Sequence, residues 1–183
     1  MFIGKQKIRK KDNGVVTIEL AIILPVLLLL FVGMFDISNF IFCRNKMIRT
    51  AQELSNVITR DDLTKPQLDS LLQGANLIAQ PFDFQTSGKV IVTSISKQDS
   101  TKPPAIMWQD SYPTGATGSK ITNMNALPGN LVLGTGETII TTEVFYTYQP
   151  TFPGYVLQSD QTAIYALAVK VPRKGAMITL PNS

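Results

Sequence analysis

A long apolar run near the N-terminus is the strongest feature of the hydropathy pattern. Residues 20–35 carry no charge. Together with residues 15–19 they would form a helix of about 21 residues and roughly 32 Å, close to the thickness of a bilayer's hydrocarbon core. Pro25 lies inside this run, which a membrane helix tolerates when neighbouring groups satisfy the freed carbonyl. The pattern predicts a transmembrane helix over residues 15–38.

Helical periodicity continues beyond the apolar run. Apolar residues recur at spacings of three, four and seven, with polar residues between them. They are Phe40, Met47, Ala51, Leu54 and Ile58. One helix is therefore expected from Val16 to about Ile58, with residues 39–58 packing on the protein's own sheet. A separate coiled-coil partner for this stripe is the alternative.

A second helix is predicted over residues 64–80. Thr64 suits the N-cap position, and Pro66 suits the first turn because its missing N–H has no helical partner there. The apolar face of this helix would comprise Leu68, Leu71, Leu72 and Ala75. Gly74 weakens the helix, and Pro81 marks its end.

The rest of the chain favours strands. Four strands are predicted within a strand-rich part, residues 88–171. The signals are alternation over residues 90–95, a β-prone stretch over 105–109, and β-branched and aromatic residues over 138–149 and 162–171. Residues 110–136 are rich in Gly, Ser, Thr, Asn and Pro, and predict a long loop, ordered at least in part, of a kind that often carries recognition. The fold class expected is α+β, with a long N-terminal helix packed on an antiparallel sheet of about four strands.

The aromatic residues of these strands have a plain structural interpretation. Tyr146 and Tyr148 share one face of a strand, whereas Phe145 and Thr147 share the other. At least one aromatic group is therefore expected in the sheet core, and Trp108 is also expected to pack rather than bind a ligand. A binding role for these aromatics is the alternative.

Length and charge divide the chain into three parts. A chain of 183 residues fits one domain plus an anchor: a basic leader over 1–14, the transmembrane helix over 15–38, and an extracytoplasmic domain over 39–183. The leader holds five basic residues and one acid, and subtracting these from 17 and 13 leaves 12 of each sign. Because this remainder is neutral, no nucleic-acid partner is expected. The basic leader favours a cytoplasmic N-terminus.

The residues available for chemistry are few. The chain has no histidine, and Cys43 is its one cysteine, so it lacks the commonest general base and cannot form an intramolecular disulfide. We expect no enzyme, no cofactor, no metal and no small-molecule substrate. An enzyme whose site needs no histidine, such as a Ser-Lys dyad or a carboxylate pair, is the alternative. Cys43 is expected to be a small buried residue on a packing face, with an intermolecular disulfide or a lipid attachment as alternatives.

Glu19 at the head of the apolar run is the residue that calls for an explanation, because a carboxylate drawn towards a bilayer centre costs about 2.5–3.5 kcal/mol and usually has a partner. A cleavable secretory signal does not fit, since the run is long and no small-x-small site follows it. A plain anchor explains the length but gives Glu19 no role. Cleavage after Gly14 would instead create an α-amino group on Val15, four residues from the acid. In a bundle of such helices, the ammonium of one subunit would pair with Glu19 of its neighbour.

The N-terminal segment has a short basic leader, Gly14 at its end and Glu19 five residues later. This combination resembles the class III leader of type IV pilin-like proteins. The resemblance implies cleavage after Gly14 by a prepilin peptidase, with Glu19 as the fifth residue of the mature chain. Val15 differs from the aromatic first residue of many major pilins, so the resemblance does not carry N-methylation of Val15 with it.

The segment GVVTIELAIILPVLLLLFVGMFDISNFIFCRNKM is more specifically similar to the TadE/TadF family of the tight-adherence (Tad, or Flp) pilus systems, most clearly over residues 15–57. Residues 143–155 and Pro172-Arg173 resemble the ectodomains of that family. The resemblance implies a pilin-like fold and a minor pseudopilin needed for pilus biogenesis and surface attachment. It also implies three kinds of partner, namely the prepilin peptidase, other pilins and the assembly platform of the bacterial inner membrane. A bitopic membrane protein whose ectodomain binds a partner without entering a filament is the alternative.

Overall fold

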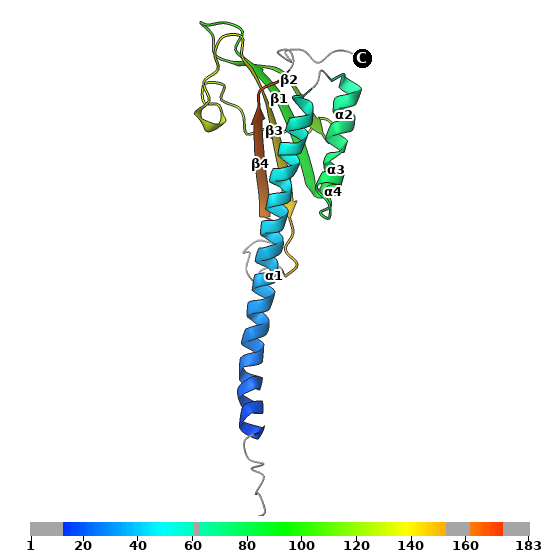
Figure 1. The fold of residues 1–183 in the computed structure, drawn as a ribbon, viewed down its shortest axis with the longest axis vertical. Helices are drawn as coiled ribbons and strands as arrows, with labels where there is room; N and C mark the ends of the chain where they lie inside the picture. Colours follow the sequence, from blue (N-terminus) through cyan, green and yellow to red (C-terminus); the bar gives the residue numbers. More distant parts are fainter. Residues whose placement is uncertain (1–12, 61–62, 153–161, 174–183) are drawn as a thin grey trace, which may run out of the picture.

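The computed structural model describes residues 13–60, 63–152 and 162–173. A single helix, α1 (Asn13–Ile58), runs the length of the molecule, and its C-terminal half carries a four-stranded antiparallel sheet (Figure 1). The strands are β1 (Gly88–Ser96), β2 (Ala105–Tyr112), β3 (Thr138–Tyr148) and β4 (Thr162–Lys170), in the spatial order β2-β1-β3-β4. The α+β fold predicted from the sequence is confirmed.

The C-terminal half of α1 packs on one face of the sheet. The buried residues of the helix recur at three- and four-residue spacings, which keep them on one face. They are Cys43, Met47, Ala51, Leu54 and Ile58. They meet apolar side chains of β1, β3 and β4, including Val92, Val144 and Ala166. The predicted packing of this stripe on the protein's own sheet is confirmed.

The segment after α1 forms short helices rather than the single helix expected over residues 64–80. The structure has α2 (Lys65–Gln73), α3 (Ala75–Ile78) and, further on, α4 (Phe84–Ser87). Gly74 lies between the first two, where its N–H donates to the carbonyl of Ser70 at 3.1 Å and its own carbonyl accepts from Ile78 at 3.2 Å, so helical hydrogen bonds still reach it from both sides. A Cβ at Gly74 would lie 2.9 Å from the carbonyl oxygen of Leu71, so the chain turns more tightly here than a residue with a side chain allows.

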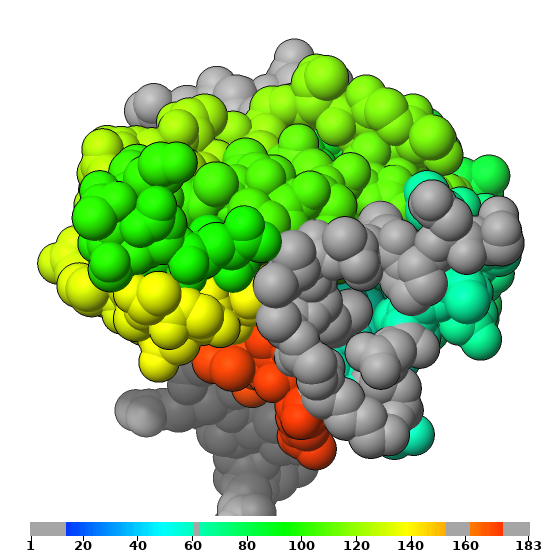
Figure 2. Space-filling view, turned by 90° about the horizontal axis from the view of Figure 1, so that it is seen from above, coloured from blue at the N-terminus to red at the C-terminus, as the bar shows by residue number. Residues whose placement is uncertain are grey.

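The second face of the sheet is covered by the long connection between β2 and β3. Isolated apolar residues of this connection pack on the side chains that β1 and β3 direct away from α1. This outer cluster consists of Ile95, Ile121, Leu127, Leu133 and Ile139. Seen from above, segments coloured green to yellow form much of the visible surface at this end of the domain (Figure 2). The connection is therefore a structural cover for the sheet, and consequently every side chain of β1 from Val90 onward is buried.

A buried carboxylate fastens this cover. Glu143 of β3 is fully buried and accepts hydrogen bonds from the Ser119 hydroxyl, from the Lys120 N–H at 2.9 Å and from the Tyr165 hydroxyl at 2.9 Å. Burial, together with the neighbouring Glu143 carboxylate, raises the pKa of Tyr165, so the phenol stays a donor throughout the physiological range. One acid thus connects β3, β4 and the β2–β3 connection.

Glu143→Gln is expected to lower the free energy of unfolding by about 1–3 kcal/mol, because the amide has one acceptor oxygen and turns two N–H donors towards groups that also donate. The measurement is urea unfolding of the full chain in detergent micelles. Glu53→Gln serves as the control, since Glu53 pairs with Arg49 at an exposed position of α1 and such pairs contribute under about 1 kcal/mol. Equal midpoints for the two variants would contradict a fastening role for Glu143.

Candidate functional site

The N-terminal half of α1 projects beyond the sheet as an apolar stem, defined here as residues 14–35 (Figure 1). Its large apolar side chains are exposed all around the helix, Leu30 and Phe31 at 66 % each. In the part of the chain that the structure describes, α1 is the one helix long and apolar enough to cross a membrane, judged by length and composition. An apolar surface of this extent requires lipid or protein around it.

The three residues singled out by the sequence lie at the free end of this stem. Val15 and Glu19 are four residues apart in α1, so they share a face and lie about 6 Å apart along the axis. Gly14 precedes them in the first turn, and a Cβ built on it would meet nothing within 4 Å. Glu19 is exposed, and its side chain has neither a hydrogen bond nor an ion pair with any residue that the structure describes. Gly14, Val15 and Glu19 therefore lie within the first two turns of α1, at the end of the stem furthest from the domain.

Asp36, at the other end of the stem, is a site residue that sequence reasoning missed. Its side chain is fully buried. One carboxylate oxygen accepts the N–H of Thr151 at 3.1 Å, and the other accepts the N–H of Phe152 at 3.2 Å. Asp36 therefore ties the chain beyond β3 to the point where α1 enters the domain. A lone acid following a long apolar run was the signal available in the sequence.

The residues around Asp36 form a closed, mostly aromatic junction. The rings of Phe40 and Tyr148 meet edge to face with centroids 5.5 Å apart. Burial raises the pKa of the Tyr148 hydroxyl, and the charge of Asp36 adds to this effect. These contacts fix the direction in which the stem leaves the domain.

Cys43 lies inside the core, as predicted. Its side chain is fully buried, and burial raises the pKa of its thiol to about 12, so the group stays protonated and inaccessible. Within the folded chain it acts as a small apolar residue. Neither an intermolecular disulfide nor a lipid attachment fits this position.

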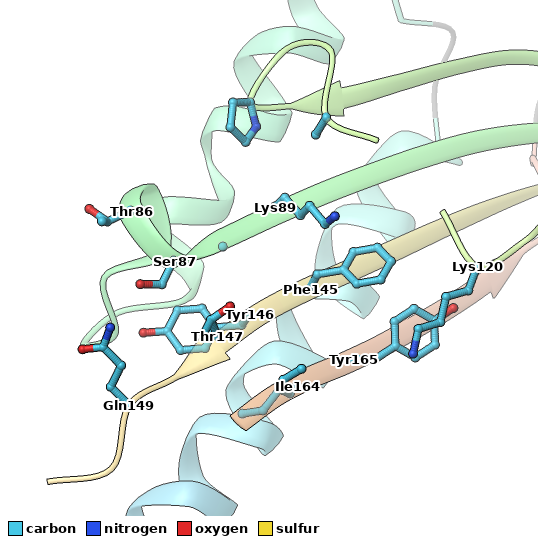
Figure 3. Close-up of a pocket in the computed structure, with 14 residues that line it drawn as sticks. Thr86, Ser87, Lys89, Lys120, Phe145, Tyr146, Thr147, Gln149, Ile164 and Tyr165 are labelled. Atoms are coloured by element: carbon cyan, nitrogen blue, oxygen red, sulfur yellow. The ribbon is translucent and has the colours of Figure 1, made fainter. Parts of the chain in front are cut away.

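An open groove of about 700 Å³ lies on the outer face of the sheet, in the part that the β2–β3 connection leaves uncovered. Figure 3 shows Lys89 of β1 extending towards the ring of Phe145 and Lys120 lying beside Tyr165. The ammonium groups are 4.7 Å from the Phe145 centroid and 4.2 Å from the Tyr165 centroid, respectively. The centroids of the Phe145 and Tyr165 rings lie 5.1 Å apart.

The groove combines apolar rings with positive charge. Among the described residues, neither Lys89 nor Lys120 has a carboxylate within ion-pair distance, although Lys89 donates to the carbonyl of Thr117 at 2.7 Å. No group of three His, Cys, Asp or Glu residues in the described ranges could hold a metal ion. The groove can therefore attract an anionic or polar surface.

The other aromatic residues pack as expected. Tyr146 and Tyr148 are buried on the side of β3 that faces α1. Trp108 of β2 is half buried and packs against the same core. These rings belong to the core of the domain, although Tyr146 also contributes to the lining of the groove.

Comparison with known proteins gives one result, and it falls on the stem. Residues 14–55 match the family model of TadE-like proteins. The matched residues lie entirely within α1, from Gly14 through the core stripe, and the TadE-like resemblance predicted from the sequence is confirmed there. No curated protein and no solved structure matches the chain. The match falls on the helix that, by length and composition, could cross a membrane.

Proposed function

We propose that this chain is a minor pseudopilin of a Tad/Flp pilus, needed for pilus biogenesis and surface adherence. The observation that carries the proposal is the exposed apolar stem, headed by Gly14 and Glu19, within a segment that matches TadE-like proteins. A long helix whose C-terminal half carries an antiparallel sheet is also the arrangement that a pilin-like fold would have. In this role the protein acts by binding other chains.

The proposed sequence of events begins in the inner membrane. The basic residues of the leader hold the N-terminus in the cytoplasm, and the domain lies outside it. A prepilin peptidase then cuts after Gly14, which leaves Val15 with a free ammonium group. The stem docks among the helices of other pilins or of the assembly platform. There the ammonium of one subunit meets Glu19 of its neighbour, and each charge is neutralised within an apolar bundle.

The test of this proposal is the N-terminus of the protein extracted from membranes. We expect mass spectrometry to find a chain that begins at Val15 in cells with an active prepilin peptidase, and at Met1 in cells without one. Deleting the gene should also remove surface pili. A Met1 terminus in the presence of the active peptidase would overturn the pseudopilin proposal.

The groove on the outer face favours a second candidate function. Two lysines without carboxylate partners among the described residues, set over aromatic rings, would suit a bitopic membrane protein whose domain binds an extracytoplasmic partner outside any filament. Processing separates the two candidates, because such a receptor needs no cut at Gly14. A chain that keeps its leader yet binds an envelope partner through Lys89 and Lys120 would favour this alternative.

A further inference from the structure

The chain beyond β3 returns to the stem below the domain. Phe152 lies beside the last two turns of the apolar stem, and together they line a groove of about 540 Å³. Its lining consists of Phe31, Val32, Met34, Phe35, Ser38 and Phe152. This surface is apolar apart from one hydroxyl, and that hydroxyl of Ser38 is bonded to the Met34 carbonyl at 2.7 Å.

The lining of this groove shows which part of α1 lies near Phe152. Residues 31–35 precede Asp36 in the helix, so the groove that Phe152 lines extends up to about 7 Å beyond Asp36 in the direction of the stem. Those same helix residues belong to the apolar surface that a membrane anchor places in lipid. The side chain of Phe152 is 40 % exposed, so part of its ring is uncovered by the protein at this level.

Asp36 makes such a position possible for the backbone. In an environment without water, an unpaired N–H costs several kcal/mol, which is why irregular backbone is rarely found there. Asp36 accepts the N–H groups of both Thr151 and Phe152, and these groups in turn neutralise part of the charge on the buried carboxylate. The pairing permits a short piece of non-helical chain to lie at the boundary of the bilayer.

From these observations we infer that residues 151–152 form a second membrane contact, in which Phe152 enters the lipid interface beside the stem while Asp36 holds the backbone. The occupant of the groove is lipid, because the groove is continuous with the apolar surface of the stem and has an almost wholly apolar lining. The inference rests on the proposed membrane anchor. Its consequence is that the domain has a fixed height and rotation on the bilayer instead of swinging freely on the stem.

The experiment uses single cysteines labelled with an environment-sensitive fluorophore on the full chain in phosphatidylcholine–phosphatidylglycerol vesicles. Native Cys43 is buried with a raised pKa, so the parent chain is expected to take up no label, which is checked first. Thr151→Cys reports on the contact while leaving Phe152 in place. Leu27→Cys reports on the stem, and Val132→Cys, at a side chain that is 89 % exposed, reports on the far end of the domain.

The expected result is quenching of the labels at positions 27 and 151 by phospholipids that carry a quencher on the acyl chain, and quenching of the label at 132 only by aqueous iodide. Quenching at 27 without quenching at 151 would overturn the membrane contact alone. An unquenched label at 27 would overturn the anchor itself, and the proposed function with it. A label at 151 shielded from both quenchers would show that protein, not lipid, covers the groove.

Two substitutions test the parts played by the named residues. Phe152→Ser removes the apolar ring from a partly exposed position and should reduce lipid quenching at 151 several-fold while leaving 27 and 132 unchanged. Asp36→Ala should release the backbone and move the 151 label into iodide-accessible water. Asp69→Ala, which removes an exposed acid paired with Lys65 in α2, is the control and should change none of the labels. Unchanged quenching at 151 in both test variants would contradict the assignment.

Discussion

Glu19→Gln is expected to abolish incorporation of this chain into pili while leaving it in the membrane. The substitution keeps the shape of the side chain but removes its negative charge and replaces one acceptor oxygen by an NH₂ donor. In the proposed bundle, the ammonium of Val15 in a neighbouring subunit would then be left without its counter-charge. Removing one partner of a buried ion pair typically costs about 3–5 kcal/mol, which is large compared with the affinity of a single helix contact. Co-purification with pilus components and a count of surface pili measure the effect.

The same substitution elsewhere on α1 provides the control. Glu53→Gln removes one negative charge from the same helix, but Glu53 pairs with Arg49 at the surface of the domain, where water screens the charges. We expect this variant to assemble as the parent does. If Glu19→Gln also assembles normally at equal expression, the acid has no pairing role, and the charge-pairing step has to be discarded.

The main features of the fold were predictable because each depends on a strong local pattern. The apolar run of the stem and the stripe from Cys43 to Ile58 follow helical spacing, and the four strands are rich in β-branched and aromatic residues. The break at Gly74 was not predicted, because a single glycine weakens a helix without specifying where the helix divides. Its location depends on the close approach of Gly74 to the Leu71 carbonyl, a contact of the folded chain.

The covered outer face of the sheet was not predictable from its strands alone. Alternation along a strand shows that one face is apolar, but it does not show what lies on the second face. The residues that cover that face, such as Ile121, Leu127 and Leu133, are spread singly through a polar connection, so no period relates them. In the sequence, Glu143 looks like an ordinary exposed acid, although in the folded chain it fastens the cover.

The candidate site also has a part that could be predicted from the sequence and a part that could not. Gly14, Val15 and Glu19 are close in sequence, and one helix places them together, so their arrangement followed from spacing. Asp36 was missed because its partners are more than one hundred residues away along the chain. The lysine–aromatic groove was missed for the same reason, since Lys89, Lys120 and Tyr165 come from separate segments. Pairings between distant segments depend on the sheet register, which the local pattern does not determine.

Gly14→Leu is expected to block processing completely, so that the protein accumulates with its Met1 terminus and does not enter pili. The proposed peptidase has to fit the residue on the N-terminal side of the cut into a small space, and a leucine side chain would fill that space. The structure separates this effect from a folding defect. A Cβ at position 14 meets no atom within 4 Å, and the helix there has no positive φ that would require glycine. The folded chain therefore accommodates leucine without strain.

Gly14→Ala is the matched variant, because it adds one methyl group at the same open position. We expect partial processing for alanine and none for leucine, with equal amounts of both proteins in the membrane fraction. The measurement is the mass of the intact protein, which distinguishes the chain beginning at Met1 from the chain beginning at Val15. The uncut leucine variant would lack the free ammonium at Val15, so it should fail in assembly as Glu19→Gln does. If the leucine variant is cut as efficiently as the parent, Gly14 is not the processing site, and the ammonium partner proposed for Glu19 does not exist.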